Sequence, residues 1–270
     1  MKQLTLPEIR QRLLGILIEL NDFCEENNIH YYLCAGTLLG AIRHKGFIPW
    51  DDDIDIAMSR PFYDKLQDIA RHNDVFHDHY KIITYQNGTT HYPFMKVLDT
   101  ETYTKQSYTN ETNENSLWVD IFPFDGVPAD INERRKLYQK ELFVRKILNL
   151  NFAKVGDGKT MSHKLIKPLF MPFAKMYGID RANKRIDELC RSYGYDRAEY
   201  VGDINWGDYD KEIMKKTDFD KPTYVTFEGH KFKTMSCWDQ YLTDLYGDYM
   251  QLPPVDQREN HELKAWLREK

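Results

Sequence analysis

The sequence has no long hydrophobic run. Charged residues make up 29% and hydrophobic residues 41% of the 270 residues, and the mean hydropathy is −0.66. This composition excludes a membrane-spanning protein and argues equally against a disordered one. The N-terminus also lacks a basic region followed by an apolar run and a small-residue cleavage site. We therefore predict a chain without a signal peptide that stays in the cytoplasm.

The sequence also lacks paired cysteines. Its four cysteines are far apart and form no C-x-x-C pair: Cys24, Cys34, Cys190 and Cys237. This spacing disfavours both a disulfide framework and a zinc site, so we expect reduced, mostly structural thiols.

The sequence lacks an excess of positive charge except in one segment. The net charge is −5, yet residues 133–191 hold 15 Lys or Arg against 6 Asp or Glu. Such separation is typical of a surface for a polyanion or an anionic membrane, or of a solvated helical face. The sequence contains no recognisable RNA-binding module and the remainder is acidic, so we expect no nucleic-acid partner.

The hydrophobic periodicity predicts a mixed α+β protein. A capping box at Thr5 and Glu8 precedes an amphipathic helix, and strands and helices alternate up to residue 130. Residues 131–200 form a basic helical elaboration, and residues 201–270 a hairpin followed by a helix. Residues 1–130 and 201–270 together form the expected catalytic core, whose predicted strands are 29–35, 53–58, 81–85, 93–98 and 118–122.

The stretch from Gly36 to Met58 carries the most chemistry. In a strand over 53–58, Asp53 and Asp55 point to one side while Ile54 and Ile56 face the core. Two adjacent carboxylates repel each other unless a divalent cation neutralises them, and hard oxygen ligands suit Mg²⁺ or Mn²⁺. An exposed acidic turn is the alternative interpretation.

The residues around this acidic pair favour an anionic ligand. Gly36 and Thr37, at the start of a helix, supply backbone N–H groups and a hydroxyl for a phosphate. Arg43, His44 and Lys45 add positive charge in the loop that follows. Such charge suits a phosphoryl group whose negative charge is spread over several oxygens.

These features resemble the nucleotidyltransferase superfamily and, within it, the LicD family of phosphocholine transferases, to which fukutin-like proteins are related. The resemblance rests first on residues 36–58. It extends through residues 94–99, 118–128 and 246–254, so it covers most of the chain outside the basic segment. Fukutin-like relatives carry a cysteine-rich zinc element. The four cysteines of this sequence are isolated and do not match that element, which disfavours a ribitol-phosphate transferase of that type.

The resemblance implies a nucleotidyltransferase-like mixed sheet in which Asp53 and Asp55 bind metal and Asp120 supplies a third carboxylate. Asp120 also lies between apolar residues, where it needs a metal or a salt-bridge partner. Asp51 is another ligand or an outer-shell group. Lys96 is either an edge lysine or a phosphate ligand.

The resemblance further implies transfer of phosphocholine from CDP-choline to a hydroxyl of a teichoic acid or lipopolysaccharide precursor, with release of CMP. Aromatic faces commonly hold quaternary ammonium groups. Trp118, Trp206 and Tyr209 are therefore candidate choline contacts, although packing is the alternative role for each. Transfer of another phospho-group or a nucleotide, and a non-catalytic membrane- or glycan-binding module, are the alternative functions.

The resemblance also implies where the acceptor lies. For LicD-like enzymes that modify teichoic acid, the acceptor is similar to a lipid-linked precursor that is assembled at the inner face of the membrane. Residues 165–176 are too few to span a bilayer, yet apolar side chains with flanking lysines suit the membrane interface. We expect peripheral association with an anionic membrane. Packing onto the core is the alternative, since Pro168 and Pro172 make a continuous helix doubtful.

Overall fold

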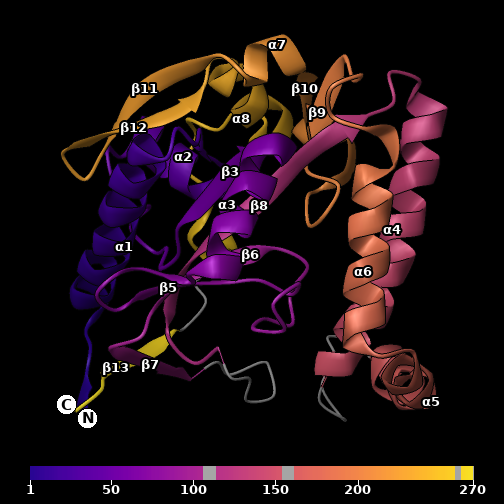
Figure 1. Cartoon of the computed structure of the whole chain (residues 1–270), viewed down its shortest axis with the longest axis horizontal. Helices are drawn as coiled ribbons and strands as arrows, with labels where there is room; N and C mark the ends of the chain where they lie inside the picture. The colour runs from indigo at the N-terminus through magenta and orange to yellow at the C-terminus, as the bar shows by residue number, and fades with distance from the viewer. Residues whose placement is uncertain (106–113, 154–160, 259–262, 270) are drawn as a thin grey trace.

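The computed structural model describes residues 1–105, 114–153, 161–258 and 263–269 (Figure 1). Of residues 161–168 and Tyr209 it describes the backbone alone. Helices and strands are mixed throughout, which confirms the predicted α+β class. Among the helices in these ranges, none combines the length and apolar character that a bilayer crossing requires.

One mixed sheet organises the core. Its eight strands follow the order β10, β9, β8, β6, β5, β4, with β3 paired parallel to β8 and β2 antiparallel to β3. The strands are β2 (Tyr32–Leu33), β3 (Asp55–Ser59), β4 (Val75–His77), β5 (Tyr80–Ile83), β6 (Met95–Asp99), β8 (Leu117–Val127), β9 (Tyr200–Gly202) and β10 (Ile213–Lys215).

Helix α1 (Leu6–Glu26) covers one face of this sheet. Its buried residues recur at helical spacing and pack toward β8 and β6, where they join the main apolar core. The predicted capping box is present, because the Thr5 backbone N–H donates to the Glu8 carboxylate at 2.8 Å. Helix α2 (Ala35–Arg43) precedes β3, and α3 (Arg60–His72) follows it.

The basic segment is helical, as predicted, and contains α4 (Ile131–Phe152), α5 (Met161–Tyr177) and α6 (Ile179–Cys190). They lie together beside the sheet (Figure 1). A second apolar cluster joins α4 and α6 to Val127 at the end of β8 and to Ile204. The doubt about a continuous helix was misplaced, since α5 runs through both Pro168 and Pro172.

A buried ion-pair network attaches this helical group to the core. The guanidinium of Arg60 in α3 contacts both carboxylate oxygens of Asp125 in β8, at 2.7 and 2.6 Å. It also donates to Asp187 in α6 at 3.1 Å. Arg191, in the short helix η1 (Arg191–Tyr193), bonds Asp187 and Asp64. Three elements distant in sequence are thereby fixed together.

The C-terminal part packs against β2 and α2. The predicted hairpin is present as β11 (Pro222–Phe227) and β12 (His230–Met235), and α8 (Trp238–Tyr246) ends at Gly247. Cys237 is the N-cap of α8, and the hydroxyl of the preceding Ser236 donates to the Asp218 carbonyl. The remaining elements are η2 (Tyr209–Glu212), α7 (Lys216–Phe219) and η3 (Val255–Gln257).

The two chain ends lie side by side (Figure 1). Strand β13 (Lys264–Leu267) pairs with β1 (Lys2–Gln3) on one side and with β7 (Thr102–Lys105) on the other. All four cysteines are free thiols, and three of them are buried in apolar surroundings. Burial raises the pKa of the Cys24 thiol to about 12, which agrees with a structural role.

Candidate active site

Three charged residues form a row across the centre of the sheet. In the register of β3, β8 and β6, Asp55 pairs with Asp120, and Asp120 pairs with Lys96. Paired residues on neighbouring strands point to the same face, so these three side chains emerge side by side. The sequence predicted each residue separately, and the parallel pairing of β3 with β8 brings them together.

Asp120 is held by two donors. The Lys96 ammonium lies 2.8 Å from Asp120 Oδ1, and the indole N–H of Trp118 donates to Asp120 Oδ2 at 2.8 Å. Trp118 precedes Asp120 by two residues in β8, so it shares the face. Both alternatives for Asp120, a salt bridge and a metal ligand, are compatible with this arrangement, since a carboxylate has further lone pairs to offer.

Carboxylates crowd around Asp55. Burial raises the pKa of Asp55 well above its usual value, and the nearby charges of Asp53, Asp120 and Asp51 raise it further. The Lys96 charge acts in the opposite direction but is outweighed. Carboxylate oxygens are the ligand type that Mg²⁺ or Mn²⁺ prefers, so the chemistry of this acidic group suits such an ion.

The start of α2 lies against this acidic group. Gly36 and Thr37 belong to the first turn of this helix, as the sequence predicted. The Thr37 hydroxyl accepts a hydrogen bond from the Asp55 backbone N–H at 2.8 Å. A Cβ on Gly36 would stand 3.0 Å from Asp51 Oδ2, so glycine permits the close approach of that carboxylate.

A strained backbone and a buried hydroxyl support this helix start. Ala35 has a φ of 45°, in the left-handed region that L-residues rarely adopt. Its N–H donates to the Tyr241 hydroxyl at 3.2 Å, and that hydroxyl donates to Glu212 at 2.8 Å. Strain of this kind persists where the surroundings impose it, commonly at functional sites.

The loop after α2 is anchored rather than free. The Arg43 guanidinium donates to the Tyr249 carbonyl at 2.8 Å, so it holds the C-terminal tail. It also donates to His44 Nε2 at 2.9 Å, and burial with the adjacent Arg43 charge lowers the pKa of His44. Both observations disfavour a positive charge on His44 and do not support the expectation that it adds one. Lys45 is exposed, and its carbonyl accepts from the Glu228 N–H in the β11–β12 turn.

Aromatic rings surround the Lys96 ammonium. Its Nζ lies 4.4 Å from the ring centre of Tyr92, 4.6 Å from that of Trp118 and 5.2 Å from that of Phe94. Burial alone would lower the pKa of Lys96, but the Asp120 carboxylate outweighs it and raises the value. Lys96 is thus a buried, charged residue in an aromatic box.

Trp206 extends the aromatic surface away from Lys96. Its ring contacts those of Phe94 and Tyr92 edge-on, at 5.4 and 6.0 Å between centres. Arg145 of α4 lies over the Trp206 ring and donates to the Trp206 carbonyl at 2.6 Å. The structure thus brings together Trp118, Lys96 and Trp206, whereas the side chain of Tyr209 lies outside the described part of the chain.

Tyr92 and Phe94 are the residues that sequence reasoning missed. Phe94 lies two positions before Lys96, so alternation along an extended segment offered a signal for it. Tyr92 lies before β6 in an irregular segment, where no periodicity applies.

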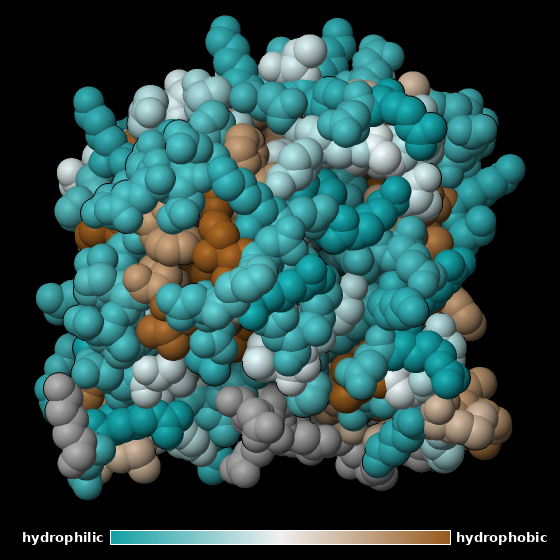
Figure 2. Space-filling view, viewed as in Figure 1, coloured by the Kyte–Doolittle hydropathy of each residue, from teal (hydrophilic) through white to brown (hydrophobic). Residues whose placement is uncertain are grey.

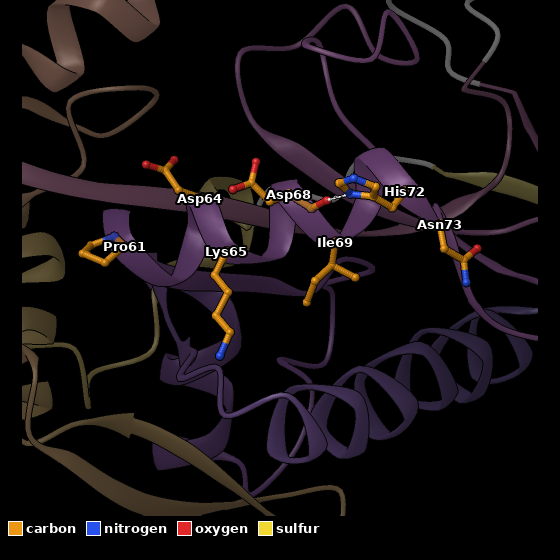
Figure 3. A pocket seen from close by; sticks show the side chains of 7 residues that line it. All are labelled: Pro61, Asp64, Lys65, Asp68, Ile69, His72 and Asn73. Carbon is orange, nitrogen blue, oxygen red and sulfur yellow. Dashed lines mark hydrogen bonds between the residues drawn. The ribbon is translucent and has the colours of Figure 1, made fainter.

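Two other features do not belong to this site. A hollow of about 650 Å³ runs along α3, with Asp64 and Asp68 on one side of the helix and Lys65 and Ile69 on the other (Figure 3). None of the predicted site residues lines it. A cluster of His79, Asp99 and Glu101 has metal-like spacing, but Arg12 neutralises Asp99 through contacts of 2.6 and 2.9 Å.

Comparison with known proteins agrees with this geometry. Residues 28–169 match the family described as LicD/FKTN/FKRP, nucleotidyltransferase domain. The chain is 33% identical to the lipopolysaccharide cholinephosphotransferase LicD of Haemophilus influenzae, over 99% of this chain and the full length of the relative. It is 26% identical to the mouse ribitol 5-phosphate transferase FKRP over 55% of this chain and 27% of that protein.

Proposed function

The chain belongs to the LicD family, and we propose that it transfers phosphocholine from CDP-choline to a hydroxyl of a cell-surface glycan precursor, releasing CMP. The acceptor is of the lipopolysaccharide or teichoic acid type. One observation carries the proposal: the row of Asp55, Asp120 and Lys96 lies inside a chain that is similar along its length to a cholinephosphotransferase.

The acidic group is suited to hold Mg²⁺ or Mn²⁺. Asp53, Asp55 and Asp120 would be the ligands, with Asp51 as a further ligand or an outer-shell group. Such an ion, when bound, supplies positive charge that neutralises phosphate oxygens.

The chain's own residues position the reactants. The first amides of α2, at Gly36 and Thr37, would donate to a phosphate of the donor. Lys96 contributes charge from the neighbouring strand. In the transfer, an acceptor oxygen forms a bond to the phosphorus that bears choline, and the bond from that phosphorus to the oxygen of CMP breaks. We assign Asp120 to accept the proton of the attacking hydroxyl.

The aromatic surface gives the choline group a place. A quaternary ammonium gains about 0.5–2 kcal/mol per aromatic face. Trp206 is half-buried and its ring meets that of Tyr92 at the box that holds Lys96, so the part of the indole that Arg145 does not cover is the proposed contact for a substrate cation. Trp118 is occupied by Lys96 and Asp120, and its role is to position them.

The proposed acceptor sets the place of reaction. A glycan precursor assembled on a lipid is available at the inner face of the cell membrane, so we propose a cytoplasmic protein that associates with this membrane from outside the bilayer. The excess of nine positive charges over residues 133–191 supports attraction to anionic lipids.

The test is an assay of purified protein with Mg²⁺, CDP-choline and a lipid-linked glycan acceptor, reading CMP and the phosphocholine-bearing product. Both should appear in equal amounts. CDP-ribitol as the preferred donor would favour the activity named for the mouse relative. Pyrophosphate release from a nucleoside triphosphate would instead indicate nucleotidyl transfer, and no turnover with any donor would favour a binding module.

A further inference from the structure

Helix α5 presents an apolar face that no described element covers. Leu169, Phe173 and Met176 follow helical spacing on one side, and their exposed fractions are 65, 61 and 77%. Phe170 flanks them at 51%. Met171 and Ala174, on the opposite side, are buried against the rest of the protein. Large side chains exposed together in this way mark an interaction surface.

Basic residues accompany this face. Lys175 is exposed on α5 itself, and Arg181 of α6 lies over the ring of Tyr177 at the end of α5, 5.5 Å from its centre. On α4, against which α5 packs, exposed Lys140 shares a face with Phe143, whose exposed fraction is 66%. Apolar atoms gather at the lower right of Figure 2, where Figure 1 places α5.

We propose that this face of α5 docks on an anionic lipid bilayer. An interfacial helix lies in the plane of the membrane with Leu, Phe or Met side chains in the acyl boundary and Lys or Arg at the headgroups. The pairing of Leu169, Phe173 and Met176 with a basic segment fits that chemistry. A second copy of the chain would place like charges opposite each other.

Docking would bring the active site to the acceptor. This role in bringing the active site to the acceptor rests on the proposed function. The docking surface does not depend on that function, because it is inferred from the exposure and charge of its residues. Binding can therefore be measured without donor or acceptor, and the failure of docking and the failure of transfer are distinguishable.

The experiment measures sedimentation of the full chain with vesicles of phosphatidylglycerol and phosphatidylcholine in equal parts. We expect binding that weakens as salt is raised and is much weaker on phosphatidylcholine alone. The double variant Leu169→Ser/Phe173→Ser should lose binding by at least about ten-fold. The matched control is Tyr224→Ser, which removes an exposed aromatic side chain on β11.

The charge variant Lys175→Gln/Arg181→Gln leaves the apolar face intact and should also reduce binding to the mixed vesicles. Circular dichroism and turnover with a water-soluble acceptor check that each variant is folded, and both should be unchanged. Equal vesicle binding by wild type and the Leu169→Ser/Phe173→Ser variant would overturn the proposal. So would a dimer in solution that this variant abolishes, because a second copy would then cover the face.

Discussion

Asp55 combines burial with like charge, so its carboxylate is unfavourable in the protein without metal. Asp55→Asn should therefore abolish turnover, by at least about a thousand-fold, while raising the metal-free stability at pH 7 by about 1 kcal/mol. Initial rates and urea unfolding with a chelator measure the two effects. Turnover within ten-fold of wild type would remove Asp55 from the proposed site.

Trp206 tests the choline assignment. Trp206→Leu removes an aromatic face but keeps apolar volume, so the KM for CDP-choline should rise by roughly ten-fold with a smaller change in kcat. Trp266→Leu is the matched control, because that indole packs on Tyr103 in the three-stranded sheet, away from the row. An unchanged KM in the Trp206 variant would contradict the assignment.

Glu141 gives a pH dependence of stability. Burial between α4 and its neighbours raises the pKa of Glu141 from 4.5 to about 8, although Arg145 lies 3.2 Å away and acts in the opposite direction. The folded form therefore binds more protons than the unfolded form between these values. The contribution of Glu141 to the free energy of unfolding is therefore fully present below about pH 4.5 and is lost as the pH rises toward 8.

Glu141→Gln should remove that dependence. Between pH 5 and pH 8 the wild type should lose a few kcal/mol more unfolding free energy than the variant. Urea unfolding at several pH values measures this difference. Parallel stability profiles for the two proteins would show that Glu141 does not titrate as described.

At this scale, alternation applies to Asp120, which lies inside β8, but not to the predicted pairing of Asp53 with Asp55, because β3 begins at Asp55 and Asp53 precedes it. Alternation could not reveal that the pKa of His44 would be lowered, since that follows from burial and the adjacent Arg43 charge. Nor could it show that Lys96 would lie in an aromatic box, because Tyr92 comes from an irregular segment.

At the scale of elements, the helical group depends on Arg60. This side chain is buried with Asp125 and reaches Asp187 in α6. Arg60→Met leaves a buried carboxylate without its partner, which costs about 3–5 kcal/mol. On the same helix, Arg71 forms an exposed pair with Asp68, so Arg71→Met should cost less than about 1 kcal/mol.

Thermal or urea unfolding of the two variants makes the comparison. If Arg60→Met and Arg71→Met destabilised the protein equally, the network would not hold the helical group. Asp125 lies in residues 118–128, one of the stretches that resemble the LicD family. In the structure it pairs with Arg60 and does not belong to the row of Asp55, Asp120 and Lys96.

Sequence periodicity predicted the longer elements but missed six short strands: β1, β4, β7, β9, β10 and β13. Residues 238–246 form the expected helix because Gly247, at φ 70°, stops it. Helix α5 was doubted because each interior proline removes a hydrogen bond. Its packing against α4 and α6 is a tertiary contact, which local sequence does not encode.

At the scale of the whole molecule, the chain has two apolar clusters. One lies with the acidic residues of the sheet and the other with the basic helices. The main cluster supports the acidic row, and the smaller cluster supports the basic helices. The fold class was predictable from the mixture of periodicities. The register that places Asp55, Asp120 and Lys96 in one row was not predictable. It depends on which strands pair and in which order, and the paired residues are up to 65 positions apart in the sequence.

The measurement that tests the central claim most directly follows the phosphorus atom. CDP-choline labelled at the phosphorus that bears choline is incubated with the protein, Mg²⁺ and a lipid-linked glycan acceptor. We predict label in the glycan, with an equal amount of unlabelled CMP, and loss of both products with chelator or with Asp55→Asn. Label that remains on free phosphocholine while the glycan gains the nucleotide would contradict the account.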